Sequence, residues 1–335
     1  MIATIVFSVL GLALVTLIAL RWETFLLFAK IFVPIFFSKL PAALITLWFV
    51  ATLVFCLTKL SGDDNLLVEG RVDQATLEAQ RKFYGLDRPI HEQYLTQVGT
   101  LLTLDSQPSR FDRNKTFRKI LVQHFPISAS LGLRAITLAL LFGVPIGIIS
   151  ALYHNRFVDQ AGTFIALVGV SVPNFIIGTV MVTVLVRQLG WFQATNWTNG
   201  FNLWIPAMAL GAFPFAAILR LTRTSMLDAL REDYIRTARA KGLSEWRVVL
   251  RHALRNSLTS VVTYLGPVMA GVLIGSLVVE QIFIIPGIGD TFVKSVSNRD
   301  TPIVLGISVF FCSLLIFMNL VVDSIYPILN PLLRK

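Results

Sequence analysis

Long apolar runs, almost free of charged residues, recur along this chain of 335 residues and limit what it can fold into. At about 1.5 Å per residue, each run lets a helix cross most or all of a bilayer core of roughly 30 Å. Seven runs qualify: 2–20, 41–58, 127–153, 161–186, 203–219, 259–279 and 303–322. With 55% hydrophobic and 14% charged residues, the composition also excludes an ordinary soluble domain. The sequence therefore predicts an all-α polytopic membrane protein.

The first run has two interpretations, a retained helix or a signal peptide. No positive residue precedes it and no clear small-residue cleavage site follows it, so we favour a retained transmembrane helix. A phenylalanine-rich stretch, 25–37, then follows at the inner interface. We treat 1–40 as one N-terminal unit and 41–60 as the next span.

Lysine and arginine predict how the chain is oriented, because short cytoplasmic loops carry an excess of them. The segment 220–258 holds nine basic residues against four acidic ones, which assigns it to the cytoplasm. With seven spans, the N-terminus then lies outside and the C-terminus inside. The basic residues are dispersed between apolar runs, so the net charge of +10 does not predict a nucleic-acid partner.

The sequence offers no recognisable catalytic or nucleotide-binding chemistry. Cys56 and Cys312 lie within apolar runs, and no spaced Cys/His set suggests zinc or a disulfide framework. The chain has no Gly-x-x-x-x-Gly-Lys-Ser/Thr phosphate loop, and neither His-Glu-x-x-His nor Gly-x-Ser-x-Gly occurs. We therefore expect a protein that is not an enzyme and that holds no cofactor or metal of its own.

The charged segment 228–258 has the pattern of two helices joined by a turn. Helix-forming residues from Asp228 to Lys241 end at Gly242, the residue type that best adopts the left-handed conformation that closes a helix. Ser244 is placed to cap a second helix that runs toward Asn256. On charge alone, this loop either only fixes orientation or also binds a partner.

Residues 234–243 and 251–256 resemble the cytoplasmic loop of ABC importer permeases, most closely the B-type (DppB/OppB type) subunit of the oligopeptide, dipeptide and nickel uptake family. That family's loop signature is Glu-Ala-Ala, three residues, Gly, nine residues, then Ile-x-Leu-Pro. Gly242 and Leu254 match it, while Arg236-Thr237-Ala238 replace Glu-Ala-Ala, and His252 and Arg255 replace Ile and Pro, as in the peptide branch. The resemblance implies a coupling helix that docks into an ATPase subunit. Its residues would be Arg236, Thr237, Ala238, Arg239, Ala240, Lys241, Gly242, Leu243, Ser244, Glu245 and Trp246.

The resemblance covers roughly 39–334 and implies the type I ABC importer permease fold. That fold has six core transmembrane helices, so the first run would be an extra N-terminal helix. The permease core would be 127–335. The polar region 61–126, with helices expected at 74–84 and 89–102, would form an extracellular cap near the docking site of a solute-binding protein. The alternative is a solvated loop without a partner.

The fourth run is interrupted at Ser171-Val172-Pro173-Asn174-Phe175. Proline frees a backbone carbonyl, which is tolerated in a membrane only where the break faces protein or water. Ser171, Pro173 and Asn174 are therefore candidates for the translocation path, and a simple packing kink is the equal alternative.

Glu280 begins the segment 280–289, which resembles the family's Glu-x-x-Phe-x-x-Pro-Gly-x-Gly, and 298–302 resembles Asn-Arg-Asp-x-Pro. A carboxylate near membrane depth is costly unless it is paired or hydrated. Glu280 either contacts substrate or forms an ion pair with Arg299 or Lys294 that orders the loop. The external-gate or receptor-docking candidates are Pro286, Gly287, Gly289, Asn298, Arg299 and Asp300.

The resemblance implies a permease subunit in a prokaryotic plasma (inner) membrane that forms half of the path for an ATP-driven peptide importer. Its partners would be a C-type permease, two ATP-binding subunits that hold ATP and Mg, an extracellular or periplasmic solute-binding protein, and membrane lipid. Nickel or a metal chelate is the alternative cargo. A stand-alone secondary transporter or channel, and a scaffold or sensor subunit that moves no solute, are alternatives of other classes.

Overall fold

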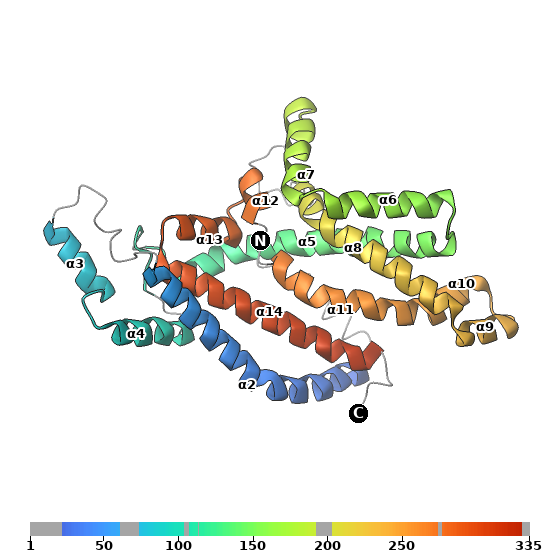
Figure 1. The fold of residues 1–335 in the computed structure, drawn as a ribbon, viewed down its shortest axis with the longest axis horizontal. Helices are drawn as coiled ribbons and strands as arrows, with labels where there is room; N and C mark the ends of the chain where they lie inside the picture. Colours follow the sequence, from blue (N-terminus) through green and yellow to red (C-terminus); the bar gives the residue numbers. More distant parts are fainter. Residues whose placement is uncertain are drawn as a thin grey trace.

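The computed structural model describes residues 22–60, 74–103, 107–112, 114–191, 203–273 and 277–329. The first predicted span, 2–20, lies outside the described residues. Within the described part the chain forms helices and no strand. Figure 1 shows long helices lying along one axis. Two short helices, α3 (Gln74–Tyr84) and α4 (Ile90–Thr103), lie at one end, and α9 (Asp233–Ala240) and α10 (Glu245–Arg247) lie at the other.

The centre of the bundle is the pair α5 (Phe117–Leu152) and α8 (Trp204–Arg231). Lipid tails are as apolar as leucine, so membrane helices associate by close packing rather than by the hydrophobic effect. Small residues allow this approach: a Cβ added at Gly211 would lie 2.8 Å from the Ala135 carbonyl oxygen, and one at Gly147 would lie 2.8 Å from that of Leu219.

Two more long helices, α11 (Leu254–Leu273) and α14 (Thr301–Leu329), pack beside this pair, and α2 (Trp22–Leu60) packs on α14. Gly266 of α11 allows close approach to Asn319 and Val322 of α14. Gly271 of the same helix makes no such approach, because an added Cβ would have no neighbouring atom within 4 Å.

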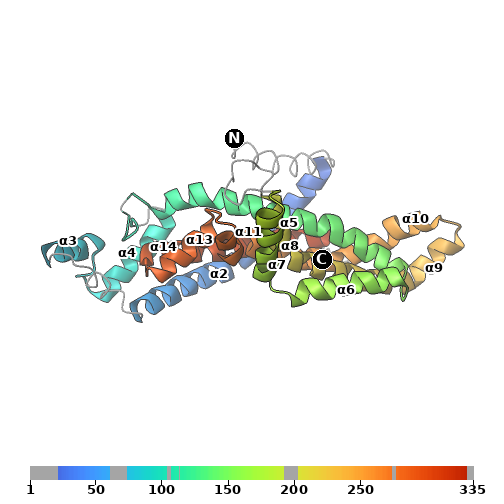
Figure 2. The ribbon, with the colours of Figure 1, turned by 90° about the horizontal axis from the view of Figure 1, so that it is seen from above.

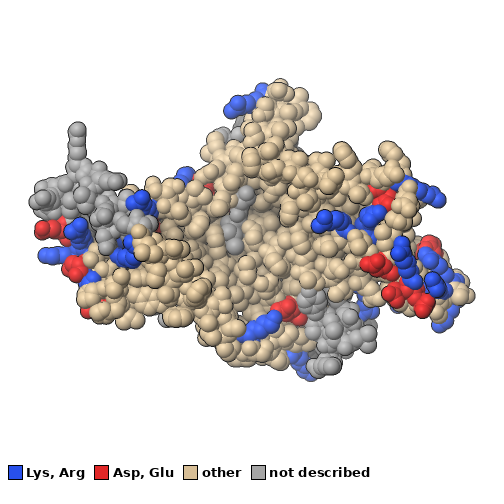
Figure 3. Space-filling view, in the orientation of Figure 1, with Lys and Arg blue, Asp and Glu red and all other residues tan. Residues whose placement is uncertain are grey.

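Five helices of the described part are long and apolar enough to cross a membrane, or six when one bent pair counts as a single span. These match the six predicted core spans. Figure 3 shows charged side chains gathered at the two ends of the molecule, with few between them on that face. The helices run past the predicted limits: α5 begins at Phe117 and α8 ends at Arg231. Caps and backbone geometry end a helix, whereas the membrane boundary only changes which side chains it carries.

The predicted interfacial segment, 25–37, and the predicted span that begins at Pro41 lie on one continuous helix. Residues 22–60 form one helix that contains Pro34 and Pro41. Proline removes one backbone donor and bends a helix without having to end it. Lys39 of α2 forms an ion pair with Asp323 of α14, which joins the two helices.

The fourth span is broken. Helix α6 (Phe157–Ser171) and the continuous α7 (Asn174–Met181) and η2 (Val182–Gln188) meet at 99°. Figure 2 shows α6 following the long axis and α7 crossing it. The predicted interruption at Pro173 is therefore confirmed as a sharp change of direction.

The polar region forms two helices, α3 (Gln74–Tyr84) and α4 (Ile90–Thr103), close to the predicted limits. Tyr94 of α4 shares a 2.7 Å hydrogen bond with Thr52 of α2, and the Tyr84 hydroxyl donates to the Ser109 carbonyl over 3.0 Å. This cap lies at the opposite end of the long axis from α9 (Asp233–Ala240) and α10 (Glu245–Arg247). A π-helical segment, η3 (Val248–Ala253), joins α10 to α11, while α12 (Leu277–Ile282) and α13 (Ile288–Ser297) precede α14.

Candidate functional site

The predicted coupling residues, 236–246, form a compact turn that we call the elbow. A single helix from Asp228 to Lys241 is the expectation from sequence, and it is wrong: α8 ends at Arg231 and Glu232 takes an extended conformation with ψ 148°. Helix α9 then starts in a new direction. The chain therefore changes direction both before and after α9, which places the elbow beyond the end of α8.

Gly242 closes α9 in the left-handed conformation, with φ 75°, as the sequence predicts. Its N–H donates to the Arg239 carbonyl over 2.9 Å, and the Leu243 N–H donates to the Ala238 carbonyl over 3.4 Å. These two bonds are those of a Schellman motif. An added Cβ at Gly242 would meet nothing within 4 Å, so the backbone conformation, not crowding, favours glycine.

Ser244 does not cap the second helix with its side chain, contrary to the prediction. Its carbonyl accepts the first bonds of the helix, from the N–H groups of Arg247 and Val248. The elbow is closed instead by Glu245, which accepts two hydrogen bonds from the Arg239 guanidinium, at 3.1 and 2.6 Å. The hydrogen bonds to Glu245 raise the pKa of Arg239 above its usual value.

The elbow is anchored by apolar residues within it and directly on either side of it. Ile235, Val248 and Ala253 are fully buried and pack with Ala238 against Met226 of α8 and Ala151 of α5. The π-helical turn η3 makes two adjacent valines, 248 and 249, face inward, where the sequence predicts a regular helix.

The outer face of the elbow is exposed. Trp246 is 70% exposed, although large aromatic side chains are usually covered. The other exposed predicted residues are Arg236, Thr237, Arg239, Ala240, Lys241, Gly242, Ser244 and Glu245, whereas Leu243 is half-buried. The exposed face of the elbow thus combines basic side chains with the exposed indole of Trp246. Tryptophan and arginine are enriched in protein–protein interfaces, so this face is suited to docking on another protein.

Glu280 of α12 lies at the centre of a buried group that we call the Glu280 cluster (Ser128, Glu280 and 287–290). Its side chain is fully buried. Ser128 of α5 donates to its carboxylate over 2.7 Å, and the Asp290 N–H donates over 3.0 Å. The Ser128 hydroxyl also accepts from the Ile288 N–H over 2.9 Å. The carboxylate thus holds the loop before α13 against α5.

The predicted ion pair of Glu280 with Arg299 or Lys294 is wrong for the described part of the chain. Lys294 pairs instead with Asp290, at 2.6 Å. Backbone N–H groups and a serine hydroxyl reach a fully buried carboxylate where a long hydrated lysine does not. Gly287 and Gly289 fit this arrangement, because a Cβ at Gly289 would lie 2.9 Å from the carboxylate and one at Gly287 would overlap it.

Two of the remaining external candidates, Pro286 and Asp300, form hydrogen bonds to segments far away in the sequence. The carbonyl of Pro286 accepts from His124 Nδ1 over 2.9 Å. Asn298 ends α13, Arg299 adopts φ 53°, and the buried Asp300 accepts from the Ser109 hydroxyl and from the Arg110 N–H. Asp300 therefore joins the cap to the start of α14.

The structure does not bring the path candidates together. Ser171 and Pro173 are exposed at the break, Asn174 is half-buried, and Glu280 is enclosed in its own cluster. Further along α7, Gly178 approaches the segment that follows α12: a Cβ added there would lie 3.3 Å from the Phe283 side chain.

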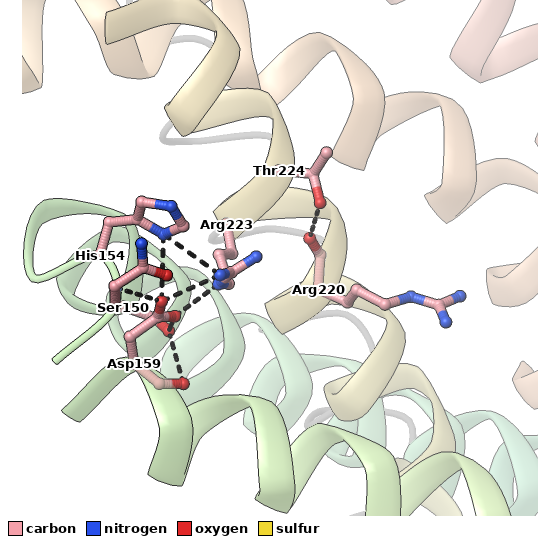
Figure 4. A network of polar contacts seen from close by, with 7 residues as sticks. Ser150, His154, Asp159, Arg220, Arg223 and Thr224 are labelled. Atoms are coloured by element: carbon pink, nitrogen blue, oxygen red, sulfur yellow. Dashed lines mark hydrogen bonds and ion pairs between the residues drawn. The ribbon is translucent and has the colours of Figure 1, made fainter. Parts of the chain in front are cut away.

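One cluster was not predicted from the sequence (Figure 4). Arg223 of α8 donates to both carboxylate oxygens of Asp159, in the first turn of α6, at 2.5 and 2.9 Å. Ser150 and the Asn155 N–H donate to the same carboxylate at 2.7 and 2.9 Å, and His154 Nδ1 lies 3.1 Å from it. A sequence signal existed: Asp159 is the only acidic residue between Asp112 and Asp228.

A bundle of helices long and apolar enough to cross a bilayer defines a multi-pass membrane protein. The family model described as "Binding-protein-dependent transport system inner membrane component" matches residues 143–335. The chain belongs to this family and has its type I ABC importer permease fold.

Curated relatives extend over most of the chain. The dipeptide transport system permease protein DppB of Bacillus subtilis is 39% identical over 289 residues, 86% of this chain and 94% of its own. The oligopeptide transport system permease protein OppB of Haemophilus influenzae is 34% identical over 89% of this chain and 98% of its own. The glutathione transport system permease protein GsiC of Salmonella typhimurium is 37% identical over 89% and 97%.

Proposed function

We propose that this chain is the B-type permease subunit of an ATP-driven importer of dipeptides or oligopeptides. It would form half of the translocation path. The names of the three relatives support the cargo class, since glutathione is itself a tripeptide. The described part of the chain offers no group of acidic, histidine and cysteine residues that fits a metal ion, so nothing specific favours nickel as the alternative cargo.

The elbow carries the proposal. Its turn is fixed by the Gly242 conformation, its inner face is anchored on α5 and α8, and its outer face is free to contact a partner. A force on such an element moves the helices to which it is anchored. The sequence has no phosphate loop, so the partner would be an ATPase subunit that binds ATP and Mg.

The full assembly would contain two ATPase subunits, a C-type permease and an external solute-binding protein. The elbow and the C-terminus would then lie in the cytoplasm, and the cap with the N-terminus outside. The excess of basic residues in 220–258 supports this orientation.

The test is uptake by the complete complex in liposomes, with radiolabelled alanyl-alanine, penta-alanine, glutathione and nickel ion offered in turn. We expect ATP-dependent, binding-protein-dependent uptake of at least one peptide and none of nickel. Uptake of nickel alone, or solute movement by this chain without an ATPase, would contradict the proposal.

A further inference from the structure

The elbow and the break in the fourth span are connected through a short series of contacts. The elbow packs on the ends of α5 and α8 through the apolar cluster around Ile235 and Met226. Arg223 lies one turn before Met226 on α8 and binds Asp159 in the first turn of α6. Helix α6 then runs without interruption to Ser171, where the chain bends by 99° into α7.

Part of the contact between α6 and α8 is made by small residues. Near the far end of α6, Gly169 lies against Ala216 and the Ala212 carbonyl, so the surfaces there are small and smooth. Helices packed in this way move past one another by shear. The packing around Gly169 therefore does little to fix the axial position of α6 relative to α8.

The Asp159–Arg223 pair resists that sliding. Two parallel hydrogen bonds between a guanidinium and a carboxylate fix both distance and direction. The Asp159 side chain is only 4% exposed and that of Arg223 23%, so water competes weakly for the pair. Ser150 and the Asn155 N–H hold the same carboxylate from the α5 side. The pair thus fixes the axial position of α6 relative to α8.

We infer that Asp159 and Arg223 are positioning residues for transport, because their ion pair transmits displacement of the elbow to the break at Ser171–Pro173. This inference rests on the proposed function, since it requires an elbow driven by an ATPase. A purely structural pair would stabilise the bundle without affecting how much transport each ATP supports.

The test measures peptide uptake per ATP hydrolysed by the complete complex in liposomes, with the radiolabelled peptide panel described above. Asp159→Asn keeps the size of the side chain and removes its charge. We expect the ratio to fall about tenfold, within the range over which coupling networks respond to mutation, with assembly and basal ATP hydrolysis retained. The double variant Asp159→Arg with Arg223→Asp exchanges the two charges and should restore part of the lost uptake per ATP hydrolysed.

The matched control is Asp323→Asn, which removes the other interhelical ion pair of the described part that joins two long spans, Lys39 of α2 with Asp323 of α14. Its ratio should equal that of the wild type. If Asp159→Asn does not assemble, Arg223→Lys replaces it, because lysine keeps the charge but loses the two-pronged geometry. An unchanged ratio in the assembled variant overturns the inference alone, whereas a wild-type complex that moves no peptide overturns the proposed function.

Discussion

The elbow and the Glu280 cluster each use a carboxylate to fix a turn, but they differ in how far the carboxylate is exposed to solvent. Glu245 bonds to Arg239 at the surface, where both side chains remain about half exposed, at 57% and 44%. Glu280 is fully enclosed and its partners are a serine and a backbone N–H. The elbow therefore keeps polar groups for a partner, whereas the Glu280 cluster uses its groups to hold α13 against α5.

The largest expected effect is on stability, from removal of the buried carboxylate. Glu280→Ala leaves the Ser128 hydroxyl and the Asp290 N–H without their acceptor, each costing about 1–3 kcal/mol. We expect a marked fall in the melting temperature of the purified subunit. Lys294→Met, which removes only the exposed ion pair with Asp290, is the control and should change stability by less than about 1 kcal/mol. Equal stability of the two variants would show that Glu280 does not hold the loop.

The opposite result is expected at the elbow. Trp246→Ala should leave stability within about 0.5 kcal/mol of the wild type, because the indole is largely exposed. It should weaken binding of the ATPase subunit by about 2 kcal/mol, the usual minimum for an interface hot spot. Titration of the ATPase subunit against purified permease measures this. Unchanged affinity would mean that the exposed tryptophan is not part of the interface.

Substitution of Gly242 tests the elbow in a different way, because it changes the backbone conformation of the turn without removing a polar or aromatic group. Alanine at φ 75° costs about 1–2 kcal/mol relative to glycine, and no clash is added. We expect Gly242→Ala to reduce uptake several-fold while the solute-binding protein keeps its affinity for peptide. Normal uptake together with normal ATPase recruitment would remove the turn from the mechanism.

The smallest effect is expected from Glu245→Gln. An exposed ion pair contributes about 0–1 kcal/mol and weakens with salt. Thermal unfolding in low and high salt should show a difference from the wild type only in low salt. A difference that persists in high salt would indicate that Glu245 is as enclosed as Glu280.

Local features of the fold were predictable from sequence, and distant pairings were not. The apolar spans, the turn at Gly242 and the break at Pro173 follow from properties of adjacent residues. The Asp159–Arg223 pair joins residues 64 positions apart, and Ser109–Asp300 joins residues 191 apart. Such partners are selected by tertiary packing, so the sequence favours the nearby cations, and not Ser128, as partners of Glu280. The sequence also gives no sign of the break at Glu232, because helix-forming residues surround it.

The most direct test of the account is a cross-link between the elbow and the ATPase subunit. Ser244 is exposed and its side chain caps nothing, so Ser244→Cys suits this purpose in a chain with Cys56 and Cys312 changed to serine. The account predicts a cross-linked product with the ATPase subunit in the assembled complex, and labelling of position 244 only from the cytoplasmic side. No cross-link, together with labelling from outside intact cells, would contradict it.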